Sequence, residues 1–230
     1  MKNVLITGAT SGIGLAISKK FLDMGYSVYG VGRDFSKVSI ESERFFPIVC
    51  DLVKYQNIEE LVRKLKKEVE IDILVNCAGV GYFGPHEEIS PTKLHKMIAL
   101  NLEAPLVLTQ LLLRDLKKRK GTVINISSIT ATKSSTYGCA YSATKAGLLH
   151  FSKGLFDEVR KTGVKVISIL PDITKTSFYD ELNFREGDEE ESYILPECVA
   201  NAVESLFLQR EGTVITEIII QPQKHIIKRK

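Results

Sequence analysis

The sequence has little that would support a metal site, a disulfide framework or a membrane span. Its 230 residues include four cysteines and four histidines, with no CxxC pair and no histidine cluster at metal-ligand spacing. No apolar run approaches the ~18 residues of a membrane-spanning helix, and the short, glycine-broken N-terminal run is unlike a signal peptide. These absences predict a reduced, metal-free, cytoplasmic protein with no membrane contact.

The sequence also has little excess of charge of either sign. The formal net charge is +3, and basic residues cluster only at 117–120 and in the tail 228–230. The first run precedes Gly121, as is typical of a helix end, and the tail is expected to be solvated. The sequence therefore predicts no nucleic-acid partner. No linker or shift of composition divides the chain, so we predict a single domain over residues 1–230.

The pattern that is present alternates strands with helices. Runs rich in β-branched residues predict strands at 4–7, 27–32, 45–50, 71–76, 122–127, 164–170 and 214–220. Helical spacing of apolar residues predicts helices at 13–24, 56–69, 92–118, 139–161 and 196–208. This order predicts an α/β, doubly wound, mainly parallel seven-stranded sheet with helices on both faces, a Rossmann-like fold.

One long connection breaks the pattern. Residues 174–195 carry several aromatic residues and the acidic run 188–191. Open parallel sheets bind ligands at the carboxyl ends of their strands, so a substrate lid is one interpretation of this segment. A solvated surface loop is the other, and composition favours neither.

A glycine-rich turn, TGATSGIG, joins the first strand to the first helix. Gly8 allows a sharp turn, Gly12 a close approach of backbone to a ligand, and Gly14 close helix packing. The free N–H groups and dipole of the helix then favour a pyrophosphate. The turn and the strand ending about 20 residues later predict a dinucleotide site.

The second strand ends in GVGRD. Arg33 lies where a carboxylate would contact the ribose of NAD, and its guanidinium suits the 2′-phosphate of NADP. Asp34 beside it would repel that phosphate unless it points elsewhere. We therefore expect NADP, with NAD the alternative; a solvated turn is the other interpretation of Arg33.

The helix predicted at 139–161 carries Tyr141 and, one turn later, Lys145. A nearby ammonium is expected to lower the pKa of the phenol, which could then exchange a proton with a carbonyl oxygen. The fifth strand ends at Ser127 and Ser128, at the same sheet edge, where a hydroxyl could hold the reacting oxygen. Spacing alone would leave Tyr141 and Lys145 an ordinary surface contact.

These motifs together resemble the single-domain branch of the short-chain dehydrogenase/reductase family over nearly the whole chain. TGATSGIG is similar to its TGxxxGxG, NCAG at 76–79 to its NNAG, and PDITKT at 171–176 to its PGxxxT. Ser128 precedes Tyr141 by the family's interval of thirteen residues. Cys77 and Asp172 depart from the family's asparagine and glycine, and Asp172 makes the PDITKT match the weaker one.

The resemblance implies an oxidoreductase that moves hydride between a nicotinamide and a carbonyl or alcohol. Tyr141 would be the general acid/base, Ser128 the carbonyl-orienting hydroxyl and Lys145 a ribose contact. Asn101 would hold a water near Lys145, bond backbone, or do both. With the glycine turn, it implies these cofactor-binding residues: Gly8, Ser11, Gly12, Ile13, Gly14, Arg33, Asp51, Leu52, Asn76, Ala78, Gly79, Tyr141, Lys145, Pro171, Ile173 and Thr176.

Alternatives remain open. A dinucleotide-binding regulator or scaffold without catalysis is the second hypothesis, which the complete set Asn101, Ser128, Tyr141 and Lys145 disfavours. Arg185 is a candidate partner for a substrate carboxylate, as in family members that act on small 3-hydroxy acids. The family commonly forms homodimers or homotetramers, and the stripe Leu106, Leu108, Leu111 and Leu112 fits such an interface or an ordinary core.

Overall fold

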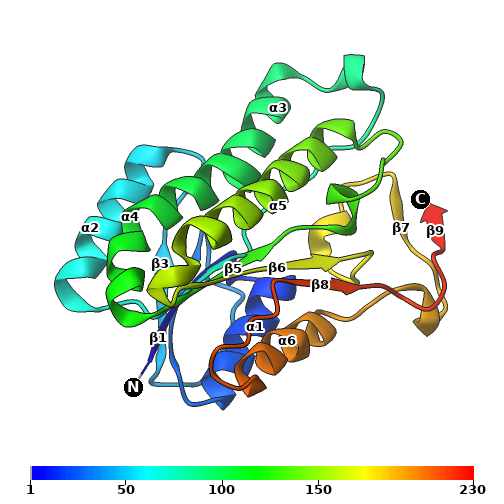
Figure 1. Cartoon of the computed structure of the whole chain (residues 1–230). Helices are drawn as coiled ribbons and strands as arrows, with labels where there is room; N and C mark the ends of the chain where they lie inside the picture. The colour runs from blue at the N-terminus through cyan, green and yellow to red at the C-terminus, as the bar shows by residue number, and fades with distance from the viewer. Residues whose placement is uncertain (1) are drawn as a thin grey trace.

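The computed structural model describes residues 2–230, and its centre is one seven-stranded, entirely parallel sheet (Figure 1). The strands in spatial order are β3, β2, β1, β4, β5, β6 and β8. Their bounds are β1 Asn3–Thr7, β2 Ser27–Gly32, β3 Phe45–Val49, β4 Ile73–Asn76, β5 Thr122–Ile126, β6 Lys165–Pro171 and β8 Glu217–Ile220. Strands β1, β4 and β5 are almost wholly buried, as expected for a sheet covered on both faces.

Helices cover the sheet in two layers (Figure 1). Helices α1 (Gly12–Asp23) and α6 (Pro196–Ser205) pack together on one face, over a core that includes Phe21, Ile124 and Val199. Helices α2 (Tyr55–Glu68), α4 (Ala104–Arg119) and α5 (Cys139–Val159) cover the other face. The predicted doubly wound Rossmann-like architecture is confirmed.

The helix predicted at 92–118 is not one regular helix. It begins as α3 (Pro91–Ile98), widens into a π-helical turn, η2 (Ala99–Glu103), and continues as α4. Pro105 has no N–H, so the carbonyl of Asn101 cannot receive the usual α-helical bond from it. This break places Asn101, which is fully buried, inside the widened turn.

By length and composition, the 29-residue run 91–119 could span a membrane, contrary to our reading of the sequence. In the structure the α4 part of this run packs its leucines over the sheet. Leu108, Leu112 and Leu116 are buried in the core shared with α2 and α5, so two leucines of the stripe considered above belong to the interior. The run is therefore a core helix of this fold.

The sequence suggested a solvated C-terminal tail, but in the structure part of the tail forms a strand. Strand β9 (Ile227–Arg229) pairs antiparallel with β7 (Phe184–Glu186), inside the 174–195 segment, as a small second sheet at the end of the molecule (Figure 1). Basic tail residues meet the acidic run. Lys224 lies 2.9 Å from Glu189 and 2.8 Å from Glu191, and Lys228 pairs with Asp188.

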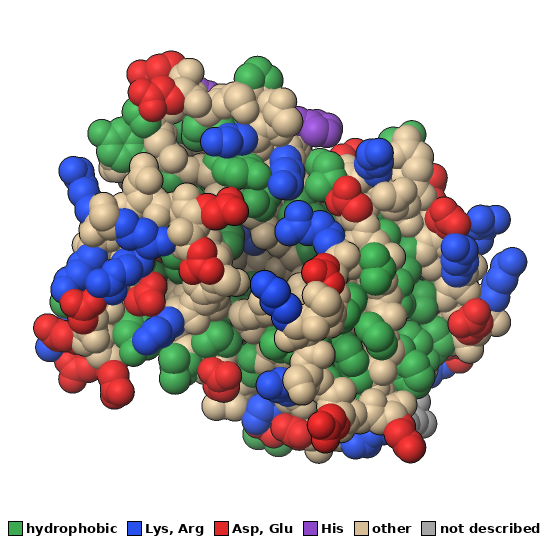
Figure 2. All heavy atoms as spheres, turned by 180° about the vertical axis from the view of Figure 1, so that it is seen from behind, with side chains coloured by type: hydrophobic (Ala, Val, Ile, Leu, Met, Phe, Trp, Pro, Cys, Tyr) green, Lys and Arg blue, Asp and Glu red, His purple; other side chains and the backbone are tan. Residues whose placement is uncertain are grey.

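The strand order changes direction between β1 and β4, because β2 and β3 lie to one side of β1 and the later strands to the other. Such a switch point opens a crevice at the carboxyl ends of the strands. The loops after β1, β4, β5 and β6 all leave the sheet at that edge. On the face opposite to the view of Figure 1, acidic and basic side chains are interspersed around a central hollow (Figure 2).

Candidate functional site

The turn after β1 has the geometry of an anion cradle. Gly8 and Gly12 adopt positive φ angles of 72° and 50°, which side chains disfavour. A Cβ on Gly14 would lie 2.2 Å from the carbonyl oxygen of Gly8, so no side chain fits there. Ser11 is the N-cap of α1, and its side chain makes no capping hydrogen bond to the first turn of that helix. The N–H groups of the turn, including that of Ile13, therefore suit a phosphate.

Thr7, which the sequence reasoning did not single out, joins the cradle to the next loop. Its Oγ1 accepts hydrogen bonds from the backbone N–H groups of Cys77 and Ala78, both at 3.0 Å. A Cβ on Gly8 would lie 2.9 Å from the Cα of Ala78, so the two loops touch. Thr7 belongs to the recognised TG motif, and its position there was the available signal.

The end of β2 bears the candidate 2′-phosphate site. Arg33 is exposed, and no ion pair involving it occurs within residues 2–230. The Asp34 carboxylate turns to Ser36, accepting from its N–H at 2.8 Å and its hydroxyl at 3.0 Å. These bonds lower the pKa of Asp34. Asp34 is thus engaged locally, while the guanidinium is open to an anion.

The residues at the ends of β3 and β4 divide into exposed and buried groups. The Asp51 side chain is exposed and accepts from Val53 N at 3.1 Å, whereas Leu52 is buried in the core. Asn76 is also buried, and its Nδ2 donates to Asn125 Oδ1 at 2.8 Å, across β4 and β5. The Leu52 and Asn76 side chains thus support the edge from within.

Ser128 and Tyr141 meet at the end of β5. Ser128 Oγ accepts from the N–H and hydroxyl of Thr130, at 3.2 and 3.1 Å, so its own proton is left to donate. Tyr141 is only 9% exposed, and burial raises its pKa to about 12, against a smaller lowering by its hydrogen bond with Ser128. Our expectation of a lowered phenol pKa is therefore wrong in this structure, because desolvation by burial is the largest influence on that pKa.

Lys145 lies on the same buried face of α5 as Tyr141, with Nζ 5.8 Å from the centroid of the Tyr141 ring. Its ammonium donates to the carbonyl oxygen of Ile126 at 2.9 Å. Burial lowers the pKa of Lys145 to about 8. The side chain of Ser127 donates to the carbonyl of Lys145 at 3.0 Å and so ties α5 to the end of β5.

Asn101 binds backbone, as one of its two expected roles required. Its Oδ1 accepts from Val80 N, and its Nδ2 donates to Val80 O, both at 2.8 Å. Nδ2 also donates to Thr144 Oγ1, which donates to the Tyr141 carbonyl at 2.7 Å. A Cβ on Gly79 would lie 3.3 Å from Asn101 Oδ1 and 3.6 Å from Lys145 Nζ, so a glycine leaves room where the three meet.

The loop after β6 runs against the cradle. The side chain of Thr176 faces Gly12, whose notional Cβ would lie 3.1 Å from Thr176 Cγ2. Pro171 ends the strand, and the N–H of Ile173 is held by Asp172 Oδ1 at 2.8 Å. Thr176 is therefore the member of this motif that lies beside the glycine turn.

Asp172, which replaces the family's glycine, turns away from the cradle toward the C-terminal segment. Gln221 Nε2 donates to its Oδ2 at 3.2 Å, while His225 Nδ1 and Lys133 Nζ lie 3.5 and 3.7 Å from that atom. The carboxylate thus joins three segments distant in sequence. No local pattern could have identified these partners.

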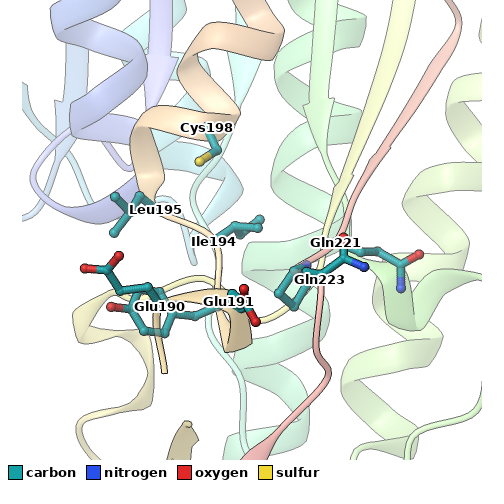
Figure 3. Close-up of a pocket in the computed structure, with 9 residues that line it drawn as sticks. Glu190, Glu191, Ile194, Leu195, Cys198, Gln221 and Gln223 are labelled. Atoms are coloured by element: carbon teal, nitrogen blue, oxygen red, sulfur yellow. The ribbon is translucent and has the colours of Figure 1, made fainter. Parts of the chain in front are cut away.

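A cavity of about 400 Å³ lies outside the predicted catalytic group. Figure 3 shows its lining from three elements: Glu190, Glu191, Ile194 and Leu195 from the 174–195 segment, Cys198 from α6, and Gln221 and Gln223 from beyond β8. Glu191 is paired with Lys224 at 2.8 Å. None of the residues predicted to be catalytic lines this cavity.

Arg185, the candidate partner for a substrate carboxylate, is already engaged. Its Nη1 lies 2.7 Å from Asp188 Oδ1 and donates to the carbonyl of Glu186 at 3.3 Å. The structure does bring together the cradle, Thr176, Asn101, Ser128, Tyr141 and Lys145 at one edge of the sheet. Thr7, Thr130 and Thr144 join them there as positioning residues.

The family described as short chain dehydrogenase matches residues 2–187. A probable NADP-dependent dehydrogenase of Haemophilus influenzae is 30% identical, over 95% of this chain and 92% of the relative. Serine 3-dehydrogenase of Agrobacterium fabrum is 35% identical, over 76% of this chain and 73% of the relative. The alcohol dehydrogenase of the archaeon Thermococcus sibiricus, solved with 5-hydroxy-NADP, superposes with a TM-score of 0.87 at 27% identity, covering 96% and 97% of the two chains.

Proposed function

Because this chain belongs to the short chain dehydrogenase family and is by that membership a nicotinamide-dependent oxidoreductase, we propose that it reduces a carbonyl compound with NADPH, or oxidises the matching alcohol. The observation that carries this proposal is the buried Tyr141, which lies on the same helix as Lys145, beside the glycine cradle. Its phenol is hydrogen-bonded to Ser128, at the end of β5.

The residues present fit a dinucleotide. Gly8, Gly12 and Gly14 leave the turn bare of side chains, and the first turn of α1 has open N–H groups for the pyrophosphate. Asp51 is exposed at the end of β3, on the adenosine side of such a cofactor. Gly79 leaves space beside Lys145 and Asn101, where a ribose would be held.

When bound, the cofactor supplies the hydride for reduction or accepts it in oxidation. In the direction of reduction, the Ser128 hydroxyl donates to the carbonyl oxygen and holds it beside Tyr141. The phenol then gives its proton to that oxygen as negative charge develops there. A pKa of about 12 keeps Tyr141 protonated before reaction, which suits a general acid. The cationic Lys145 stabilises the resulting phenolate across the buried face of α5.

The expected NADP preference rests on Arg33. Its guanidinium is exposed at the end of β2, and Asp34, which would repel a phosphate, is held by Ser36. The relative from Haemophilus influenzae is named as NADP-dependent, and the archaeal structure contains an NADP derivative. Both are consistent with this role for Arg33.

The proposal is tested with Tyr141→Phe, assayed by NADPH consumption with a panel of ketones and aldehydes. The loss of the acid should lower kcat by about 10² to 10⁴, while calorimetry should find NADPH affinity nearly unchanged. Tyr26→Phe is the matched control, since the Tyr26 ring packs against Phe21 and Phe207, away from Ser128. If wild-type protein binds NADPH but turns over no carbonyl compound, the alternative of a non-catalytic regulator replaces this proposal.

We further propose a homodimer or homotetramer, as is common in the family. Light scattering coupled to size exclusion would contradict this if only monomer is found at micromolar concentration.

A further inference from the structure

Five aromatic rings, one of them the candidate acid Tyr141, form a closed circuit of neighbouring rings. Phe83 lies 5.3 Å and Phe178 5.9 Å from Tyr141, measured between ring centroids. Tyr179 lies 5.2 Å from Phe178 and 5.7 Å from Phe184, and Phe184 lies 5.1 Å from Phe83. These residues, 83, 141, 178, 179 and 184, are called the ring cluster below. Because each ring touches the next, the surroundings of the phenol are mainly apolar.

The ring cluster is assembled by parts of the chain far apart in sequence. Phe178 and Tyr179 belong to the short helix η5 (Ser177–Tyr179), and Phe184 begins β7. Phe83 comes from the loop after β4. Two glycines make room for it. A Cβ on Gly81 would lie 2.6 Å from both Phe178 and Phe83, and one on Gly138 would lie 2.9 Å from Phe83.

Four basic side chains near the ring cluster are already bonded to other groups. Arg185 lies 2.7 Å from Asp188, and Lys228 pairs with the same carboxylate. Lys230 Nζ donates to the backbone carbonyls of Tyr179 and Asp180, on the exposed side of the segment. Lys145 donates to the Ile126 carbonyl. To meet a substrate carboxylate among the rings, any of these four cations would have to give up its present partner, which costs free energy.

The two phenols of the ring cluster, those of Tyr141 and Tyr179, are also uncharged. Burial raises the pKa of Tyr141 to about 12 and raises that of Tyr179 as well, so both stay neutral near pH 7. Val80, Tyr82 and Leu94 are partly buried in the same apolar cluster as Tyr141, and they are uncharged too.

We propose that the site takes an uncharged carbonyl compound with a flat, apolar substituent, such as an aryl ketone, and rejects substrates that carry a carboxylate. This inference rests on the proposed function. Phe83, Phe178 and Phe184 are the residues that determine the selectivity: they accept the substituent by replacing ring–ring contacts with ring–substrate contacts. The carboxylate substrate considered in the sequence analysis, with Arg185 as its partner, is thereby disfavoured.

The first experiment compares two ketones of nearly the same shape. Methyl 4-acetylbenzoate and 4-acetylbenzoate differ at the remote end in a neutral ester or a carboxylate. The ester should have a kcat/KM at least about 100-fold higher, since only the acid loses hydration without compensation. A ratio near one, or preference for the acid, would overturn the inference and leave the proposed function standing. So would rapid oxidation of serine with NADP. If neither ketone nor any other carbonyl compound reacts, the proposed function and this inference both fail.

The second experiment tests the ring cluster itself. Phe178→Leu should lower the ratio of kcat/KM for acetophenone to that for acetone by about tenfold. Phe207→Leu is the matched control, because Phe207 packs against Phe21 at 5.7 Å and is outside the ring cluster. It should leave the ratio unchanged. Should Phe178→Leu fold poorly by circular dichroism, Phe184→Leu makes the same test. An unchanged ratio in a folded variant contradicts the role of the rings.

Discussion

Gly12 offers a test that separates cofactor binding from folding. It has a φ of 50°, and a Cβ there would lie 3.1 Å from Thr176 Cγ2 and 3.3 Å from Thr176 Cβ. Gly12→Ala therefore adds backbone strain and a methyl group where the pyrophosphate would lie. Gly154 is the matched control. It lies in α5, is exposed, and an added Cβ there would meet nothing within 4 Å.

The two substitutions should change the stability of the protein in opposite directions. Holding alanine in the left-handed region costs about 1 to 2 kcal/mol, so Gly12→Ala should lower Tm by about 2 to 8 °C for a chain of this size. Gly154→Ala should stabilise α5 by about 0.5 to 1 kcal/mol. The first variant should remain folded, because a domain typically has about 5 to 15 kcal/mol of stability.

Binding should respond to one substitution alone. Gly12→Ala should raise the Kd for NADPH at least about tenfold, since the added methyl excludes a close approach to the backbone, whereas Gly154→Ala should leave it unchanged. In the double variant the two changes in the free energy of unfolding should add, because the sites share no contacts. Its Tm should therefore rise again, while its affinity for NADPH should stay low. Scanning calorimetry and titration calorimetry measure the two quantities. Unchanged affinity in Gly12→Ala, or recovered affinity in the double variant, would refute the assignment of the cradle.

Three further predictions concern single side chains. Burial lowers the pKa of Lys145 to about 8, so its ammonium loses its charge as the pH rises through that value, while Tyr141 stays protonated. The value of kcat/KM for reduction should therefore fall above about pH 8. A flat pH profile there would contradict a role for the Lys145 charge. Arg33→Ala should raise KM for NADPH at least about tenfold with little effect on KM for NADH, and equal effects on both would remove the reason to expect NADP. Thr144→Val removes the acceptor for Asn101 Nδ2 and should lower the free energy of unfolding by about 1 to 3 kcal/mol, as measured in urea.

Much of the sheet could be predicted because each central strand is a local pattern. The runs that became β1, β4 and β5 are buried on both faces and therefore apolar throughout, a signal that needs no knowledge of their partners. The small sheet of β7 and β9 gave no such signal. Its strands have three residues each, and they are joined by pairing and by charges across about 40 residues of sequence, as between Lys228 and Asp188.

The candidate site shows the same division. Fixed spacings identified the glycine turn and Tyr141 with Lys145, because a tight turn and a helix relate residues close in sequence. They could not give the sign of the change in the Tyr141 pKa. That sign depends on burial beneath Phe83 and Phe178, which arrive from two other parts of the chain.

By itself, then, the sequence determined the chain order of the seven parallel strands and the main helices between them, the position of the glycine turn and which side chains share a face of α5, since all three depend on local backbone geometry. Only the tertiary structure decided that Asn101 would lie in a widened turn bonded to Val80, that Asp172 would face Lys133 and His225, and that Arg185 would be paired with Asp188. These contacts join distant segments, and they arise when burial and charge pairing bring those segments together.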